Sequence, residues 1–228
     1  TAGAGVQHSE MFPLLKEEEE NPLLLFQIWL NLPKASKNVP PYFGMLWNED
    51  IPVVAETDEN GKLSQIKIIT GAFKDVQYGS PAPESFAANP ENEVAVWLIE
   101  MEAGASLALP KASVKANRSI YCYEGEEAFI EEREISNGFM AKLNANEDTL
   151  IKNGSSKSHF ILLQGRPIGE PVVQHGPFVM NTSEEIRQTM MDYQRTQFGG
   201  WPWPIYAHTH EPNRGRFALH ADGRSEEP

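Results

Sequence analysis

The stretch Glu93-Val-Ala-Val-Trp-Leu-Ile-Glu-Met101 indicates the class of fold. Apolar side chains occupy both of its alternating faces, because every position from Val94 to Ile99 is apolar. A strand of this composition is typical of the interior of a barrel or a sandwich, where both faces of a sheet are covered. We therefore expect a β-rich fold.

Short strand-like segments recur along the rest of the chain, separated by residues that favour turns. Asp58-Glu-Asn-Gly61 and Asn137-Gly138 are two of these turn signals. Besides residues 93–101, the pattern predicts strands at residues 5–10, 23–31, 51–56, 62–70, 106–109, 119–123, 128–135, 149–151 and 159–164. Many short strands at this spacing favour an all-β barrel or sandwich.

One helix is predicted near the C-terminus, over residues 182–198. Thr182-Ser-Glu-Glu185 has the spacing of a capping box, in which the side chains of the first and last residues satisfy each other's main-chain N–H groups. Apolar residues then recur at helical spacing, which predicts a packing stripe. We expect the helix to end at Gly199-Gly200 and residues 199–228 to form an irregular tail.

The composition limits the classes of function. The 228 residues carry a net charge of −13 and no basic stripe, so we expect no direct binding to nucleic acid. Cys122 is the only cysteine, which excludes an intramolecular disulfide, and its strand-like flanks predict a buried, inert thiol. No segment is long and apolar enough to span a bilayer and no secretory signal pattern is present, so we expect no membrane partner and a cytoplasmic location.

Two potential metal ligands lie close together near the start of the chain. His8 and Glu10 are two residues apart on an expected strand, so their side chains should project to the same side. An imidazole nitrogen and a carboxylate oxygen suit iron, zinc, copper or manganese, but such sites usually recruit three or four protein ligands. His208-Thr-His210 is a second pair, which is either a surface loop or, if the tail folds back, part of the same site.

Longer stretches of the sequence resemble a known family. The first is Thr1-Ala-Gly-Ala-Gly-Val-Gln-His-Ser-Glu-Met11, followed by Leu25-Phe-Gln-Ile-Trp-Leu-Asn-Leu-Pro33. The second is Glu170-Pro-Val-Val-Gln-His-Gly-Pro-Phe-Val-Met-Asn-Thr182, and Ser158-His-Phe-Ile-Leu-Leu-Gln-Gly165 lies between them. In this order and separation, the stretches closely resemble the pirin family of the cupin superfamily, and the ending resembles an extension found in some bacterial members.

The resemblance implies an all-β fold with a C-terminal helix, in which two cupin barrels, each a double-stranded β-helix or jelly-roll, pack face to face. Residues 1–40 would be the end of the N-terminal, metal-binding barrel with its linker, and residues 41–181 the C-terminal cupin barrel. The helix and the tail would follow. The chain would thus be the second half of a bicupin that lacks the N-terminal part of its first barrel. The second barrel has no His-x-His where a cupin metal motif would fall, so we expect it to be metal-free.

The resemblance also implies a cofactor. In pirins, the first barrel holds a mononuclear iron, Fe²⁺, with three histidines and one glutamate. Carried over residue by residue, His8 and Glu10 match two of these ligands, and the family's His-Pro-His stretch would lie upstream of Thr1. We therefore expect iron to be incompletely bound by, or absent from, this chain.

Two functions follow from the resemblance. The first is an iron-dependent quercetin 2,3-dioxygenase-type oxidoreductase acting on a flavonol-like small molecule, with Glu10 as a ligand or an acid–base group. We expect the 228-residue form to be inactive alone. The second is a non-enzymatic regulatory protein, comparable to a transcription cofactor, that binds a protein partner according to the state of its iron. The alternative to both functions is that the chain is a fragment with no separate activity. The sequence gives no oligomeric state.

Overall fold

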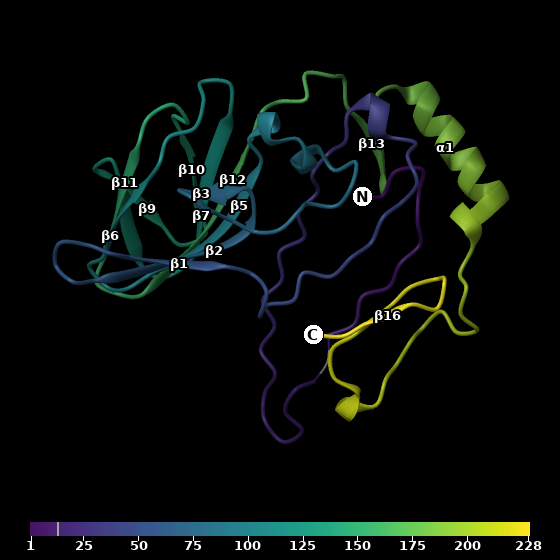
Figure 1. Ribbon diagram of the computed structural model, residues 1–228, viewed down its shortest axis with the longest axis horizontal. Coiled ribbons are helices and arrows are strands. Elements are labelled where there is room, and N and C mark those ends of the chain that lie inside the picture. The colour runs from purple at the N-terminus through teal and green to yellow at the C-terminus, as the bar shows by residue number, and fades with distance from the viewer. Residues whose placement is uncertain (13) are drawn as a thin grey trace. The chain divides into compact units, whose positions relative to one another are not determined.

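The computed structural model describes residues 1–12 and 14–228. The chain divides into two compact units, and each is built from segments that are not contiguous in sequence. The terminal unit consists of Thr1–Met45, Ala82–Ser85 and Gly169–Pro228, and the barrel unit consists of Leu46–Pro81 and Phe86–Ile168. Figure 1 shows that most of the strands, coloured blue to green, belong to the barrel unit.

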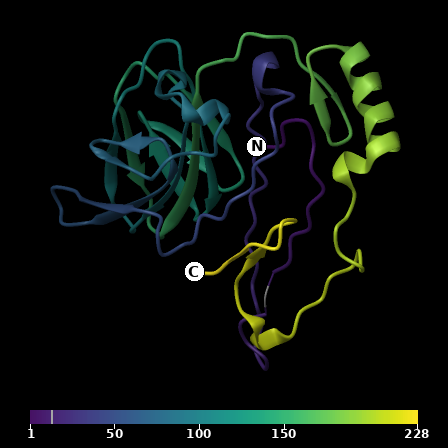
Figure 2. The same cartoon turned by 45° about the vertical axis from the view of Figure 1, so that its right-hand side comes forward.

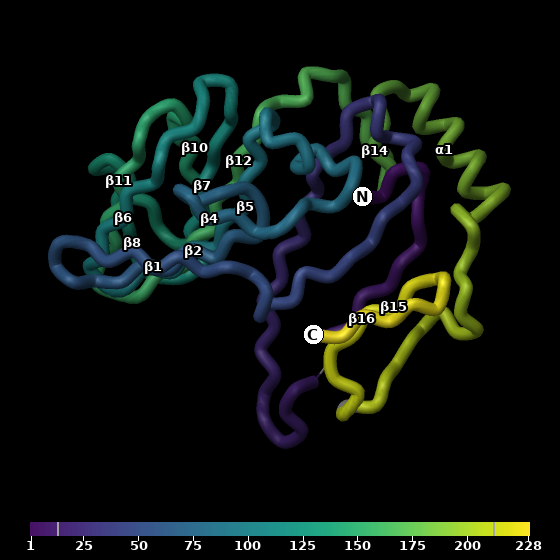
Figure 3. Tube along the Cα trace, viewed as in Figure 1, coloured from purple at the N-terminus to yellow at the C-terminus, as the bar shows by residue number. Residues whose placement is uncertain are grey.

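Two antiparallel sheets form the barrel unit, which Figure 3 shows as a continuous trace. The larger has the order β1-β2-β5-β12-β7-β10 and the smaller has the order β6-β11-β8-β9. The strands of the larger sheet are β1 (Val53–Thr57), β2 (Leu63–Thr70), β5 (Ala95–Met101), β12 (Ser158–Gly165), β7 (Asn117–Glu124) and β10 (Met140–Leu143). Those of the smaller sheet are β6 (Ser106–Leu109), β11 (Thr149–Asn153), β8 (Glu127–Ile130) and β9 (Arg133–Ser136). The unit also holds the hairpin β3 (Ala72–Phe73) and β4 (Val76–Gln77) and the 3₁₀ turns η2 (Phe86–Ala88) and η3 (Pro90–Asn92).

Rows of buried side chains from the two sheets form one hydrophobic core. In the larger sheet, Leu162 of β12 lies opposite Trp97 of β5 on one side and Ile120 of β7 on the other. In the smaller sheet, Ile151 of β11 lies opposite Leu107 of β6. All five side chains are buried and belong to the same cluster. Burial of these aliphatic and aromatic surfaces is the main force that holds the barrel unit together.

The strand that indicated the fold class buries one face completely and the other in part. Burial alternates along β5, with its odd-numbered residues buried and its even-numbered residues half-buried. The odd-numbered face contributes to the core, so the period of two that defines a strand is visible in burial although it is weak in the sequence.

A charged side chain lies within this core. Arg118 of β7 is 1% exposed, and its guanidinium group donates hydrogen bonds to Oε1 of Gln164 (2.7 Å) and to the carbonyl oxygen of Pro110 (2.8 Å). The guanidinium carbon lies 6.0 Å from the centre of the Trp97 ring. Burial lowers the pKa of Arg118, which shows the cost of holding this charge away from water.

Helix α1 (Ser183–Thr196) is the main regular element of the terminal unit, which Figure 2 shows from a second direction. The predicted capping box is confirmed, because the Thr182 hydroxyl accepts from the Glu185 main chain (3.1 Å) and the Glu185 carboxylate accepts from the Thr182 main chain (2.9 Å). The unit's other elements are η1 (Lys34–Ser36), β13 (Val173–His175), β14 (Phe178–Met180), η4 (Gln197–Gly199), η5 (Pro212–Arg214), β15 (Ala218–Leu219) and β16 (Ser225–Glu226). None of the helices in the described part of the chain has the length and apolar character needed to cross a bilayer.

The helix ends two residues before its predicted end at residue 198. Helix α1 ends at Thr196, before the glycines, because Gln197 and Phe198 adopt left-handed backbone angles with φ of 54° and 52°. This conformation is rare for residues other than glycine and costs about 1–3 kcal/mol at each position. The surrounding contacts must therefore hold the turn in place.

Three strand predictions also differ from the structure. Residues 5–10 and 23–31 form no strand, because neither segment joins a ladder within the described residues and a strand exists only where its main chain is paired. Residues 128–135 form two strands, β8 and β9, because Glu131 and Glu132 have left-handed φ values of 46° and 69° and make a tight turn. The predictions at residues 106–109 and 159–164 are confirmed by β6 and β12.

Candidate metal centre

His8 and Glu10 lie side by side in the terminal unit. The Nδ1 atom of His8 is 3.8 Å from the Oε1 atom of Glu10, and the two side chains are 62% and 59% exposed. The pair therefore offers one nitrogen and one carboxylate donor from the same side of the chain, open to solvent.

The segment before this pair is half-buried at every second residue. Residues 1, 3, 5 and 7 are half-buried, whereas residues 2, 4, 6 and 8 are exposed. Thr1 and Tyr42 exchange two hydrogen bonds, from the Thr1 amino group to the Tyr42 carbonyl (3.0 Å) and from the Tyr42 main chain to the Thr1 carbonyl (2.9 Å). The Ala4 main chain donates to the carbonyl of Val39 (2.9 Å). The main chain is thus anchored at residues 1 and 4, and His8 is exposed.

The described residues bring no third ligand to this pair. Among them, no three His, Cys, Asp or Glu side chains form a group that could hold a metal ion. His208 and His210 stack on each other, with ring centroids 6.1 Å apart, and His208 packs 5.4 Å from Trp201. In the described structure, the histidines of the tail therefore contact neighbours within the tail and form no such group with His8 and Glu10.

A second histidine with carboxylate neighbours lies in the barrel unit. The Nε2 atom of His159 is 3.0 Å from Glu100, and its Nδ1 atom is 3.0 Å from Glu124. Hydrogen bonds from Lys157 and His159 lower the pKa of Glu100. Because Lys157 adds a positive charge to the same carboxylate, the arrangement is an ion-pair cluster near the ends of three neighbouring strands, β5, β12 and β7.

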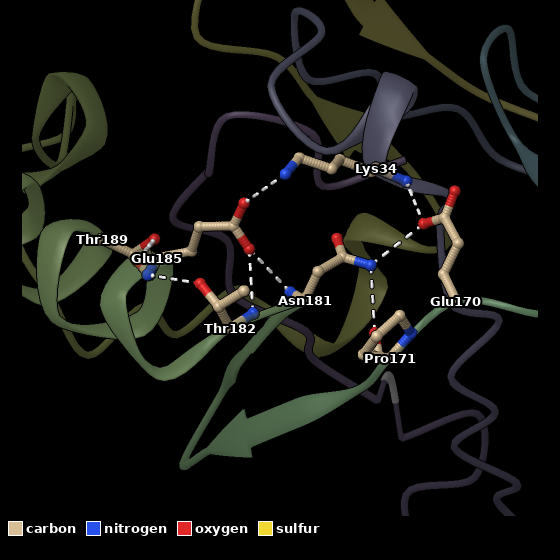
Figure 4. A network of polar contacts seen from close by, with 7 residues as sticks. All are labelled: Lys34, Glu170, Pro171, Asn181, Thr182, Glu185 and Thr189. Atoms are coloured by element: carbon tan, nitrogen blue, oxygen red, sulfur yellow. Dashed lines mark hydrogen bonds and ion pairs between the residues drawn. The ribbon is translucent and has the colours of Figure 1, made fainter.

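A polar network joins residue 34 to the start of α1 (Figure 4). Glu170 accepts hydrogen bonds from the main-chain nitrogen of Lys34 (2.6 Å) and from Nδ2 of Asn181 (3.0 Å). Glu185 accepts from the main-chain nitrogens of Asn181 (3.0 Å) and Thr182 (2.9 Å), and lies 3.2 Å from Nζ of Lys34. The network thus joins the residue that follows Leu25–Pro33 to the stretch Glu170–Thr182 and the start of α1. The capping pattern marked Glu185 and the family resemblance included Glu170, but no sequence pattern marked Lys34.

The chain from residue 23 to residue 30 has many apolar side chains open to solvent. The exposed ones include Leu23, Leu24, Leu25, Ile28, Trp29 and Leu30. Folded monomers rarely expose contiguous apolar patches of more than a few hundred Å², and larger patches usually mark an interface. We call these six residues the apolar segment.

The two facing antiparallel sheets of the barrel unit are those of a cupin. A crystal structure of quercetin 2,3-dioxygenase from Acinetobacter baumannii aligns with a TM-score of 0.62 and 26% sequence identity, covering 74% of this chain and 55% of that one. Residues 96–199 match the family model of the pirin C-terminal cupin domain. The chain belongs to the pirin family of the cupin superfamily.

Curated relatives agree with this assignment. Human pirin is 31% identical over 207 residues, which cover 87% of this chain and 63% of the human protein. A pirin-like protein of Caulobacter vibrioides is 31% identical, with 86% of this chain and 65% of that protein covered. A Pseudomonas aeruginosa protein provisionally named quercetin 2,3-dioxygenase is 32% identical, with 85% and 64% covered. The chain thus spans a little under two thirds of the length of these relatives.

Proposed function

We propose that this chain is part of a metal-dependent, quercetinase-like dioxygenase, in which His8 and Glu10 are two ligands of the catalytic metal. The observation that carries the proposal is the 3.8 Å separation of the imidazole and the carboxylate on one exposed side of an anchored segment. The likeness to quercetin 2,3-dioxygenase of Acinetobacter baumannii supports the class of reaction and a small-molecule substrate of flavonol type.

The donor set fits iron. Imidazole and carboxylate are the ligands of mononuclear non-haem iron sites, which keep open positions for other groups. A bound iron would supply Lewis acidity and redox chemistry. His8 would bind through a ring nitrogen, and Glu10 would act either as a ligand or as a base that accepts a proton from a substrate hydroxyl.

The remaining ligands would come from a first barrel to which residues 1–40 belong, with residues 41–181 as a separate second barrel that needs no metal. Two features support this division. The described residues supply two ligands and no third, and the apolar segment is exposed where a barrel strand would be covered. Strands of that first barrel would pair with residues 5–10 and 23–31 and bury their apolar side chains. On this proposal, the present chain alone does not turn over a flavonol.

Metal content and oxygen consumption with quercetin test the proposal, on this chain and on a longer polypeptide that carries the segment preceding it. We expect iron binding and turnover only in the longer form, and their loss in its His8→Ala and Glu10→Ala variants. His175→Ala is the control, because that exposed histidine lies on β13. Wild-type turnover in both variants would contradict the proposal.

A regulatory role is the second candidate, carried by the charge. The net charge of −13 suits docking to a basic protein partner in the cytoplasm, with bound iron changing the surface that the partner contacts. Full iron loading of the longer form without turnover on a panel of flavonols would favour this role over the enzyme.

A further inference from the structure

We propose that the C-terminal end of α1 positions the His8–Glu10 pair, through a contact of Phe198 with Gly5 and a hydrogen bond from Gln7 to Gln197. This role rests on the proposed function, because positioning His8 and Glu10 matters only if the two side chains bind the metal. It adds positioning residues that come from the opposite end of the chain.

The first observation is the alternation along residues 1–8. The half-buried positions 1, 3, 5 and 7 face the terminal unit, and His8 belongs to the exposed set. Residues 3 and 4 form a turn, closed by a hydrogen bond from the Gly5 main chain to the Ala2 carbonyl (2.9 Å), and beyond the turn Gln7 is half-buried while His8 is exposed. A contact that holds Gln7 therefore restricts the position of the neighbouring imidazole.

The second observation is that Gly3 and Gly5 have no room for a side chain. A Cβ atom on Gly5 would lie 2.5 Å from Cδ2 of Phe198, and one on Gly3 would lie 2.1 Å from the carbonyl oxygen of Val39. No side chain fits at either position, and both glycines have positive φ values, of 111° and 51°. The main chain at Gly5 thus packs directly against the Phe198 ring.

The third observation is a specific polar contact. Nε2 of Gln7 donates a 2.7 Å hydrogen bond to the carbonyl oxygen of Gln197, the residue that caps the C-terminus of α1. Gln7 is the neighbour of His8, so this bond fixes the main chain one residue before the imidazole. Figures 1 and 2 both show the purple N-terminal segment running beside α1.

Several contacts hold the end of α1 in one arrangement. Gln197 and Phe198 are held in a left-handed conformation that few residues adopt, and the Phe198 ring packs 5.1 Å from Tyr193 of the helix and 6.1 Å from Phe178 of β14. Strained backbone of this kind is retained where surrounding contacts determine it and where function uses it. The aromatic cluster gives the positioning surface a fixed shape.

The test uses Gln7→Ala in the longer polypeptide that carries the segment preceding this chain, with Gln194→Ala as a matched control on the exposed surface of α1. Paramagnetic Co²⁺ is the probe, and the imidazole signals of His8 in NMR spectra report its binding to the pair. Loss of a group that orients a ligand weakens metal affinity by about 10–100-fold. We expect Gln7→Ala to weaken Co²⁺ binding at His8 by about tenfold, and Gln194→Ala to leave it unchanged.

Amide hydrogen exchange without metal provides the second readout. Gln7→Ala should speed exchange across residues 5–10, and Gly5→Ala, which displaces the Phe198 ring, should do the same. Unchanged Co²⁺ affinity in Gln7→Ala, with faster exchange, overturns the positioning role and leaves the ligand role intact. Failure of Co²⁺ to affect His8 in the unsubstituted longer polypeptide overturns the ligand role and the positioning role together.

Discussion

The ammonium group of Lys34 lies 3.2 Å from the carboxylate of Glu185, so a residue from the first fifth of the chain contacts the N-terminal turn of α1. The same carboxylate completes the capping box with Thr182. The helix therefore begins at a point where an ion pair between distant parts of the sequence and a local cap share one acidic side chain.

This sharing predicts a dependence on pH. The hydrogen bond from Lys34, together with those from the main chain, lowers the pKa of Glu185 below its ordinary value of 4.5. A carboxyl group whose pKa falls on folding adds stability above its unfolded pKa and loses that contribution as the pH falls through the folded pKa. The helical circular dichroism signal should therefore fall more steeply with decreasing pH, below about pH 4.5, in the unsubstituted chain than in Glu185→Gln. Identical acid profiles would contradict this assignment.

Removal of the N-cap should weaken the terminal unit. Thr182→Ala removes the acceptor of the Glu185 main-chain N–H and should lower the free energy of unfolding by about 1 kcal/mol. Ser183→Ala, at the next and exposed position, is the control and should change it little. Urea titrations of the three proteins measure the difference, and an equal effect of both substitutions would argue against the cap.

Replacement of the buried arginine should weaken the barrel unit more strongly. Arg118→Met keeps much of the side-chain volume but leaves Oε1 of Gln164 and the Pro110 carbonyl, both of half-buried residues, without this donor. Each unsatisfied buried group costs about 1–3 kcal/mol, so we expect a loss of about 3 kcal/mol in unfolding free energy. Arg195→Ala removes an exposed ion pair on α1 and should cost less than about 0.5 kcal/mol.

The single thiol should be unreactive in the folded protein. Cys122 is 1% exposed in β7, and burial raises the pKa of its thiol, so little thiolate is present at neutral pH. An aromatic disulfide reagent should therefore modify the protein only in denaturant, and then at one site per chain. Rapid modification of the native protein would show that β7 opens locally.

The apolar segment should make this chain associate with itself or bind hydrophobic dyes. Leu24 and Trp29 are 64% and 56% exposed, and replacing both with lysine should reduce self-association by adding charge to the patch. Sedimentation velocity at several concentrations measures the change. Val114→Lys, at an isolated exposed valine of the barrel unit, is the control and should have no effect.

The parts of the fold that sequence predicted are those with strong local signals. The capping box at Thr182 and the strand at residues 106–109 need only nearby residues to be recognised, and the structure has both. The turn at Glu131 and the helix end at Gln197 could not be predicted, because neither position carries the glycine or asparagine that usually adopts a positive φ. Tertiary contacts determine both.

In the candidate site too, local features could be predicted from the sequence and long-range contacts could not. The side chains of His8 and Glu10 were predicted to lie together on a strand; the structure has no strand there, yet their nitrogen and oxygen atoms are 3.8 Å apart. The hydrogen bond from Gln7 to Gln197 joins residues at opposite ends of the sequence, and no periodicity reports on such a contact. A role for both histidines of the tail was left open by sequence, and the structure stacks them on each other.

The central position of β12 determines when the barrel unit can form as the protein is synthesised. Its neighbours β5 and β7 are each hydrogen-bonded to β12, and β12 is the last strand of this unit in the chain, so it is the last to leave the ribosome. Chains emerge at about 5–20 residues per second, so the earlier strands wait several seconds with their core faces uncovered. The apolar segment, which is made earlier still, adds to this exposed surface, and the larger sheet can close only after Gly165 has emerged.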